Sequence, residues 1–179
     1  MTLGLEEFTV RARRLRWLLC DVDGVLTDGR LYYGANGEPM AAFDIKDGLG
    51  LKLAQLGGLM VGVLSGRTSA AVAARTAELR LDAAVFGRID KGVALAEFCL
   101  THGCELDEIA YLGDDLPDLP ALRRCGLALA PSDAAPEVLA AAHRILGRPG
   151  GRGAVREAVE SILRARGDWD RVVAPFVAD

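Results

Sequence analysis

Short apolar runs alternate with longer amphipathic stretches along most of this 179-residue chain. The apolar runs are only four to six residues long, which is typical of buried strands rather than helices. Short strands that alternate with helices indicate βαβ units and a parallel sheet. Right-handed crossovers then place the C-terminal end of every strand at the same edge. Strands are expected at 17–20, 59–64, 83–86, 109–112 and 127–130, and helices at 50–56, 69–79, 91–101, 119–125, 136–142 and 154–165.

One segment departs from this alternation. Residues 30–33 and 40–45 flank Asn36-Gly37, which favours a tight hairpin turn because both central residues of such a turn take positive φ. We therefore expect a β-hairpin directly after the first strand, above the edge where the strands end. The insert, at about 29–46, is too short to be a domain, so residues 1–179 are expected to form a single domain.

Composition excludes several classes of function. The net charge is −4, and the chain lacks the basic face of a nucleic-acid-binding protein; the arginines at 11–16 are interpreted as a helix end or a turn before the first strand. No apolar stretch approaches the ~20 residues that span a bilayer. The four cysteines lack metal-ligand spacing and lie in or beside apolar segments, which is typical of buried thiols in a reducing compartment. We expect a cytoplasmic protein with no nucleic-acid or membrane partner.

Two carboxylates follow the first predicted strand. Asp21 and Asp23 come directly after 17–20 and precede Gly24, at the edge of an open α/β sheet where ligands bind. A single aspartate at this place often caps a turn or a helix. A pair can act on a phosphate ester when a hard cation and positive charges offset their repulsion. The pair therefore predicts phosphoryl transfer through an aspartyl-phosphate.

Three more acids follow the predicted strand 109–112. Asp114, Asp115 and Asp118 lie within five residues and repel one another unless a cation sits among them. N-capping of the next helix explains one of them but not all three. Ligands that are all oxygen favour Mg²⁺ over softer metals. We expect Mg²⁺ at this end of the sheet.

Two other strand ends carry groups that suit a phosphate. Ser65 and Arg67 follow 59–64 and offer a hydroxyl, backbone amides and a forked cation, although Ser-Gly-Arg is also an ordinary turn. Lys91 opens the helix at 91–101, and its charge would lower the cost of gathering the carboxylates. Taken alone, a lysine at this place would be a surface residue.

In this order the four segments resemble the motifs of the haloacid dehalogenase-like phosphatases. From about Leu15 to the C-terminus the chain resembles, more specifically, the 3-deoxy-D-manno-octulosonate 8-phosphate phosphatase family. The resemblance implies a Rossmann-like parallel sheet with helices on both faces, a hairpin after the first strand and no cap domain. The matching segments are 21–29, 43–50, 65–67, 113–118 and 150–157, of which 43–50 and 150–157 are the most particular to that family.

The resemblance also implies roles for individual residues. Asp21 would be the nucleophile and a metal ligand, and Asp23 the general acid and base, with its backbone carbonyl on the metal. Asp114 would be the other carboxylate ligand, supported by Asp115 and Asp118. Ser65 and Lys91 would hold the transferring phosphoryl group. The substrate site would be lined by Asp23, Asp44, Ile45, Lys46, Asp47, Gly48, Lys52, Arg67, Arg75 and Lys91.

The family is tetrameric, so the resemblance implies a homotetramer in which a neighbouring subunit completes each site. The expected activity is Mg²⁺-dependent hydrolysis of 3-deoxy-D-manno-octulosonate 8-phosphate in lipopolysaccharide precursor synthesis. Lys46, Lys52, Arg67 and Arg75 could recognise a sugar-acid carboxylate, or some of them could be ordinary surface charges. Two alternatives are a phosphatase for another nonulosonate phosphate, such as a sialic-acid-type 9-phosphate, and a non-catalytic oligomerisation module.

Overall fold

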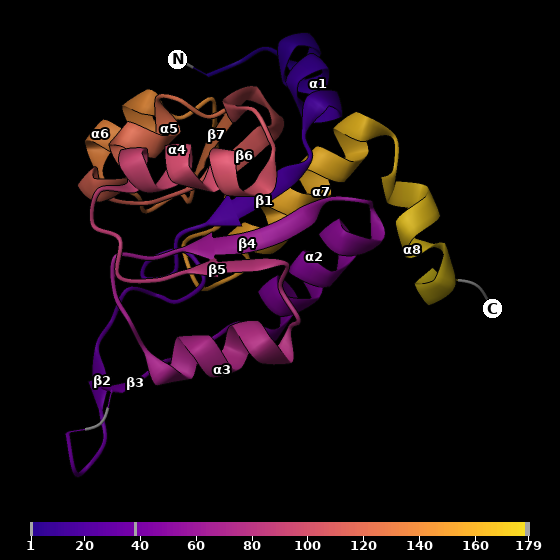
Figure 1. Ribbon diagram of the computed structural model, residues 1–179. Helices are drawn as coiled ribbons and strands as arrows, with labels where there is room; N and C mark the ends of the chain where they lie inside the picture. The colour runs from indigo at the N-terminus through magenta and orange to yellow at the C-terminus, as the bar shows by residue number, and fades with distance from the viewer. Residues whose placement is uncertain (1, 38, 178–179) are drawn as a thin grey trace.

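The sheet of this protein has six parallel strands with β1 near its centre. The computed structural model describes residues 2–37 and 39–177. The strand order is β5-β4-β1-β6-β7-β8 (Figure 1). Cys20 of β1 lies opposite Val63 of β4 and Leu112 of β6, so the three strands end within one residue of the same level. The strands are β1 (Trp17–Cys20), β4 (Met60–Leu64), β5 (Ala83–Val85), β6 (Ile109–Leu112), β7 (Leu127–Ala130) and β8 (Arg144–Ile145).

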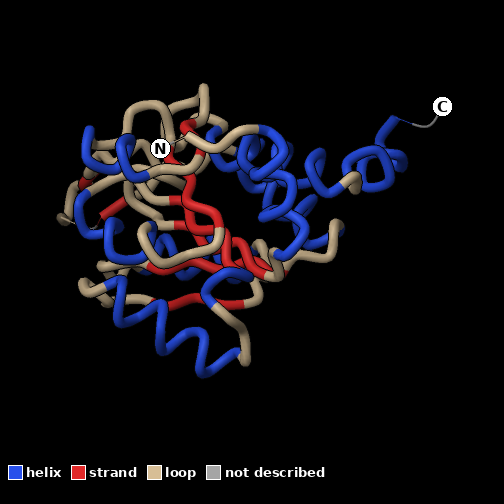
Figure 2. The backbone as a smooth tube through the Cα atoms, turned by 90° about the horizontal axis from the view of Figure 1, so that it is seen from above, coloured by secondary structure: helices blue, strands red, loops and turns tan. Residues whose placement is uncertain are grey.

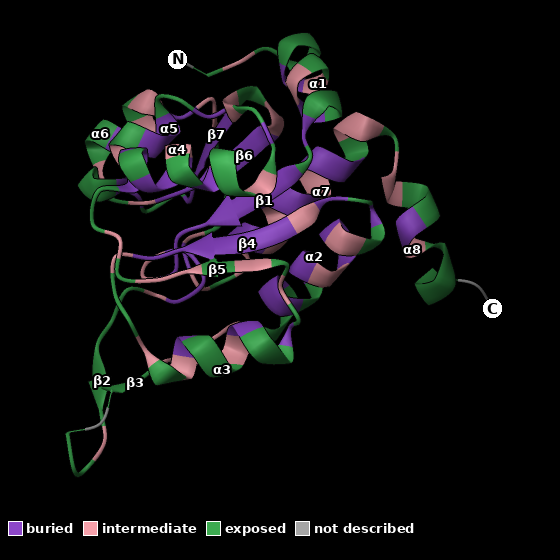
Figure 3. Cartoon of the chain, in the orientation of Figure 1, coloured by how far each residue is buried: buried purple, intermediate pink, exposed green. Residues whose placement is uncertain are grey.

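Helices cover both faces of this sheet (Figure 2). One apolar cluster packs α1 (Leu5–Arg14), α2 (Ile45–Leu56), α3 (Ala70–Glu78) and α7 (Ala154–Arg166) against one face. A second cluster packs α4 (Lys91–His102), α5 (Leu119–Leu122) and α6 (Pro136–Ala141) against the other. The last helix, α8 (Trp169–Val177), packs on α7 and α2. The central strands β1, β4, β6 and β7 are the most deeply buried of the six, whereas β5 and β8 at the two edges are only partly buried (Figure 3).

The predicted α/β fold and its five strands and six helices are confirmed, with shifts at their ends. The largest shifts are in α2, which begins five residues earlier than expected, and in α5, which ends after four residues. β8, α1 and α8 were not expected. β8 has only two residues, and α1 buries only Phe8 and Ala12, so neither gives a strong apolar pattern. The arginine run at 11–16 is the end of α1 and the turn into β1, as interpreted.

The hairpin after β1 is present but shorter than predicted. β2 (Tyr32–Tyr33) pairs antiparallel with β3 (Pro39–Met40) and projects from the edge where the strands end (Figure 1). The expected pair of positive φ angles at Asn36-Gly37 is wrong: Gly37 has φ 78°, and Arg80 is the only described residue other than glycine with positive φ. The turn is wider and is closed by the Gly37 N–H, which donates to the Gly34 carbonyl at 3.0 Å. The expected strand at 40–45 ends early because Asp44 caps α2.

The imidazole of His143, which bonds to the backbone of β7, makes the stability of the protein depend on pH. Its Nδ1 accepts a hydrogen bond from the Ala128 N–H at 2.9 Å, which requires the neutral ring. Burial, and then the nearby charge of Arg11, lower the pKa of His143 below its ordinary value. The unfolded chain therefore binds the proton more readily, and the stability from this group is present above about pH 6.5 and lost as the pH falls.

We expect the free energy of unfolding to fall less steeply from pH 7 to pH 5 in His143→Gln than in the unsubstituted chain. Glutamine can accept the Ala128 N–H and does not titrate in this range. Urea denaturation at several pH values measures the difference. Equal slopes in the two proteins would contradict the assignment.

Candidate active site

The turn after β1 holds its two aspartates in different surroundings. The Asp21 N–H donates to the Leu112 carbonyl at 2.9 Å, which extends the β1–β6 pairing by one residue. The Val22 carbonyl accepts from the N–H groups of Leu26 and Thr27, so the turn is internally bonded. As a result Asp21 is only 7% exposed, whereas the Asp23 side chain is 40% exposed. The inner carboxylate is fixed at the floor of the site and the outer one faces solvent.

Lys91 joins the ends of two strands. Its ammonium lies 2.7 Å from Asp21 Oδ2 and 2.5 Å from Asp118 Oδ1, and the residue is 3% exposed. Burial lowers the pKa of Lys91, but the charges of Asp21 and Asp118 together outweigh it and raise the pKa above its ordinary value. Lys91 is therefore a fixed cation, and its position follows from the start of α4, where Asp90 caps the helix.

Both carboxylate oxygens of Asp118 accept two hydrogen bonds each from neighbouring groups. Its Oδ1 accepts from Lys91 and from the Tyr111 hydroxyl at 2.7 Å, and its Oδ2 accepts from the N–H groups of Asp114 at 3.0 Å and Asp115 at 3.2 Å. These four donors occupy the lone pairs of both oxygens. Asp118 therefore positions Lys91 and the acidic loop, and its oxygens are not available to a metal.

Asp21 and Asp114 are the two carboxylates placed to meet a cation. Oxygens of Asp21, Asp114 and Asp118 lie within 4.8 Å of one another. Burial, followed by the charge of Asp118, raises the pKa of Asp21 to about 6, although Lys91 opposes the shift. Burial and the charges of Asp118 and Asp21 raise the pKa of Asp114 to about 8. The described residues give Asp114 Oδ1, which is buried, no hydrogen-bond partner.

These properties fit a divalent cation. A cation beside Asp21 and Asp114 would satisfy the unpaired oxygen and offset the repulsion between the carboxylates. The donors are all oxygen, which suits Mg²⁺. Gly24 lets the turn approach this place, because a Cβ on it would overlap Oδ2 of Asp114. The residues present therefore fit the expected metal.

A cleft of about 430 Å³ opens above these residues. It is lined by Asp21, Asp23, Lys91 and Asp114, together with Arg67, whose guanidinium is 3.8 Å from Asp23 Oδ1. Ser65 is buried in an adjoining hollow that it shares with Asp23 and Arg67, and its hydroxyl accepts from the Arg67 N–H at 3.2 Å. The chain thus gathers the four strand-end motifs around this cleft and the adjoining hollow.

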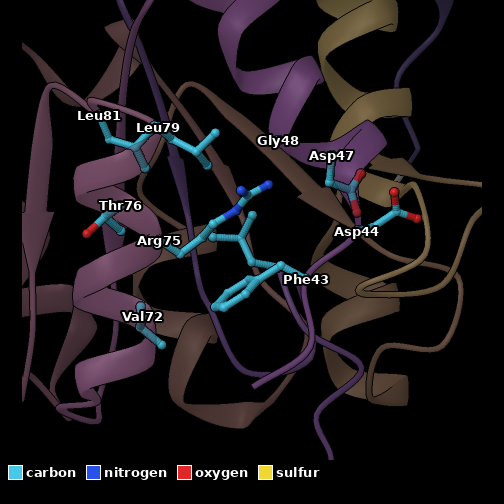
Figure 4. A pocket seen from close by; sticks show the side chains of 10 residues that line it. Phe43, Asp44, Asp47, Gly48, Val72, Arg75, Thr76, Leu79 and Leu81 are labelled. Carbon is cyan, nitrogen blue, oxygen red and sulfur yellow. The ribbon is translucent and has the colours of Figure 1, made fainter. Parts of the chain in front are cut away.

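The other residues expected to line the substrate site lie apart from this cleft. Asp44, Asp47, Gly48 and Arg75 surround a small separate hollow between α2 and α3 (Figure 4). The Lys52 ammonium is bonded within the chain, to Gln55 Oε1 at 2.7 Å and to the Leu79 carbonyl.

Lys46 lines a groove of about 570 Å³ on another side of α2, and Ile45 is 82% exposed. A single chain therefore does not bring these residues to Asp21.

Sequence reasoning missed Tyr111, whose buried hydroxyl holds Asp118. Its position inside the apolar strand 109–112, just ahead of the acids, was the available signal. It also did not anticipate that Asp47 would be buried beside α7.

Comparison with known proteins gives concordant matches. The model of a haloacid dehalogenase-like hydrolase family matches residues 52–156. The 3-deoxy-D-manno-octulosonate 8-phosphate phosphatase of Haemophilus influenzae is 40% identical over 157 residues, which cover 88% of this chain and 87% of that protein. The corresponding enzyme of Yersinia pestis is also 40% identical, over 90% of this chain and 86% of its own length.

A solved structure is similar over nearly the whole chain. It is the 3-deoxy-D-manno-octulosonate 8-phosphate phosphatase of Moraxella catarrhalis in complex with magnesium, phosphate and KDO. It has a TM-score of 0.93 and 36% identity, and the match covers 97% of this chain and 99% of that one. Among the residues described here, no helix is long and apolar enough to cross a membrane. The chain belongs to the haloacid dehalogenase-like hydrolases and, among them, to the 3-deoxy-D-manno-octulosonate 8-phosphate phosphatase family.

Proposed function

We propose that this protein is a Mg²⁺-dependent phosphatase that hydrolyses 3-deoxy-D-manno-octulosonate 8-phosphate to the sugar acid and phosphate, in lipopolysaccharide precursor synthesis. The observation that carries the proposal is the pair of neighbouring carboxylates, Asp21 and Asp114, of which Asp21 is paired with the buried ammonium of Lys91. The relatives named for this activity, and the complex with magnesium, phosphate and KDO, support the choice of substrate and metal.

Asp21 and Asp114 would hold the metal, with the backbone carbonyl of Asp23. When bound, Mg²⁺ would supply positive charge to the phosphate and to the nucleophile. Lys91 and Ser65 would bind oxygens of the transferring phosphoryl group. Positioning and neutralisation of charge supply most of the catalysis in phosphoryl transfer.

The two aspartates divide the chemistry between them. A carboxylate oxygen of Asp21 attacks phosphorus, and the bond from phosphorus to the sugar oxygen breaks as Asp23 donates its proton to that oxygen. Asp23 then takes a proton from a water molecule that attacks the phosphorus of the aspartyl-phosphate. The bond to Asp21 breaks, phosphate leaves, and both residues return to their starting forms. The exposure of Asp23 suits this role, because it must meet both the sugar and water.

The sugar acid would be recognised by Arg67 in the cleft and by residues of a neighbouring subunit. Asp44 to Gly48, Lys52 and Arg75 are the family's remaining substrate positions, and they lie apart from Asp21 in the single chain. The hairpin carries exposed Leu31, Tyr33 and Met40, which suit a contact between copies. We place these features in a homotetramer of single-domain chains spanning residues 1–179.

A cytoplasmic location is part of the same proposal. All four cysteines are free thiols, and three of them are buried, which suits a reducing compartment.

Light scattering should give the mass of a tetramer, four times 19.0 kDa, at micromolar concentration. Replacing Tyr33 and Met40 together by serine should lower the mass and the activity in parallel, because the apolar contact between hairpins is removed. A fully active monomer would contradict the shared site.

Phosphate release should depend on the sugar and on the metal. With Mg²⁺ we expect kcat/KM for 3-deoxy-D-manno-octulosonate 8-phosphate to be about tenfold or more higher than for nonulosonate 9-phosphates and hexose phosphates. This ratio corresponds to a difference of about 1.4 kcal/mol in activation free energy. EDTA should abolish release, and Mg²⁺ should restore it. Preference for a nonulosonate phosphate would change the substrate and keep the mechanism. No release from any substrate would favour an oligomerisation module.

Asp21→Asn should lower phosphate release by about 10⁴-fold or more, because the amide is a poor nucleophile. The fold should survive, since Lys91 keeps its partner Asp118. A melting curve checks the fold, and Asp170→Asn, on the exposed side of α8, is the matched control. Full activity in Asp21→Asn would contradict the assignment of the nucleophile.

A further inference from the structure

Asp47, the third residue of α2, has a carboxylate that is buried although none of the described lysines or arginines forms an ion pair with it. The residue is 1% exposed. Its Oδ2 accepts from the Gly153 N–H at 3.0 Å, and its Oδ1 accepts from the Arg156 N–H at 2.8 Å. Figure 4 shows the Asp47 side chain turned away from the hollow that Phe43 and Val72 line. Both oxygens are therefore used by the backbone of a distant segment.

These two bonds cap the start of α7. Gly153 is the N-cap residue of that helix and, having no side chain, cannot bond the free N–H groups of the first turn. Asp47 supplies the missing acceptor from another helix, and its negative charge lies at the positive end of the α7 dipole. The cap thus joins residues that are more than 100 positions apart.

The loop that leads into α7 lies against the catalytic turn. The Gly151 N–H donates to the Val25 carbonyl at 2.8 Å. A Cβ on Gly150 would overlap the Gly24 carbonyl, and one on Gly151 would overlap Thr27. The opposite side of Gly24 faces Asp114. Residues 24–27 are therefore held between the glycine loop and the acidic loop.

We propose that Asp47 is a positioning residue for the phosphatase reaction. By capping α7 it fixes residues 150–153, which in turn hold the turn that carries Asp23 and bring Gly24 against Asp114. The inference rests on the proposed function for its kinetic consequence. It departs from the family resemblance, which places Asp47 among the residues that line the substrate site.

Asp47→Asn tests this role with little change in size. The amide nitrogen would face a backbone N–H, so one of the two hydrogen bonds is lost. We expect amide hydrogen exchange to rise about fivefold or more in 150–156, as the loss of one buried hydrogen bond implies, and to rise also in 22–28. We expect kcat to fall about tenfold, with KM changed less than about twofold, because both oxygens of the Asp47 carboxylate are already bonded to the backbone of the segment that begins α7.

Glu160→Gln is the matched control. Glu160 lies one turn beyond Arg156 on α7 and pairs with its guanidinium at 2.6 Å, without a hydrogen bond to the Asp47 carboxylate or to the backbone of the glycine loop. This variant should keep the exchange rates of 22–28 and the kcat of the unsubstituted enzyme.

Two results with Asp47→Asn would overturn the proposal. A raised KM with unchanged kcat would make Asp47 a substrate ligand. A lower melting temperature with unchanged kcat and unchanged exchange in 22–28 would make it only an anchor for α7. If the wild-type chain released no phosphate from any substrate, the proposed function would fail, but the exchange rates would still test the link.

Glu157→Gln provides a second test should Asp47→Asn fail to fold. The half-buried Glu157 carboxylate accepts from the N–H groups of Gly147 at 2.8 Å and Arg148 at 3.0 Å, at the other end of the same loop. Its substitution should raise exchange in 22–28 and lower kcat, by less than Asp47→Asn does. Unchanged values in both measurements would overturn the proposal.

Discussion

The ion pairs of Lys91 with Asp21 and Asp118 are the interaction on which the site depends. Two buried carboxylates at adjacent strand ends repel each other, and one buried ammonium between them makes their approach possible. Asp118 reaches Lys91 because Tyr111 and two backbone amides fix both of its oxygens. The remaining negative charge, on Asp21 and Asp114, is what a cation and a phosphate would share. The same buried charges therefore stabilise the strand ends and provide the groups for the proposed reaction.

The sheet order explains why one lysine can serve two strands. β1 lies between β4 and β6, and the three end within one residue of the same level, so the loops after them open on one edge. Lys91 enters from the start of α4, which packs on the face opposite α2 and α7. The same edge carries the hairpin, in the place where a larger insertion would form a cap. A small insert leaves the cleft open to a neighbouring copy, which agrees with the proposed tetramer.

Residues close together in the sequence were the ones that could be predicted. The pairs Asp21–Asp23 and Asp114–Asp118 each follow an apolar strand, so the strand ends and the parallel sheet place them together. β8 could not be predicted because its two residues leave no periodic pattern, and α1 was missed because it is mostly polar and buries only Phe8 and Ala12. The predicted two-residue turn at Asn36-Gly37 was wrong because Tyr33 pairs with Pro39, which leaves five residues between the paired strands. The burial of Asp47 depends on α7, more than 100 residues away, and no local pattern reports such a contact.

The contact between α2 and α7 also gives a physical reason for two sequence segments to occur together. The segment 43–50 contains the acceptor, and the segment 150–157 contains the two N–H groups and the glycines that lie on the catalytic turn. Gly50 is part of the same contact, since a Cβ there would come within 2.9 Å of the Arg156 Cα. A change in either segment would leave the other with an unpaired buried group or a steric overlap, which costs more than losing an exposed contact. The two segments together support the turn that carries Asp21 and Asp23. Their role in the reaction is therefore to hold this turn in place, and it requires no contact with the phosphate.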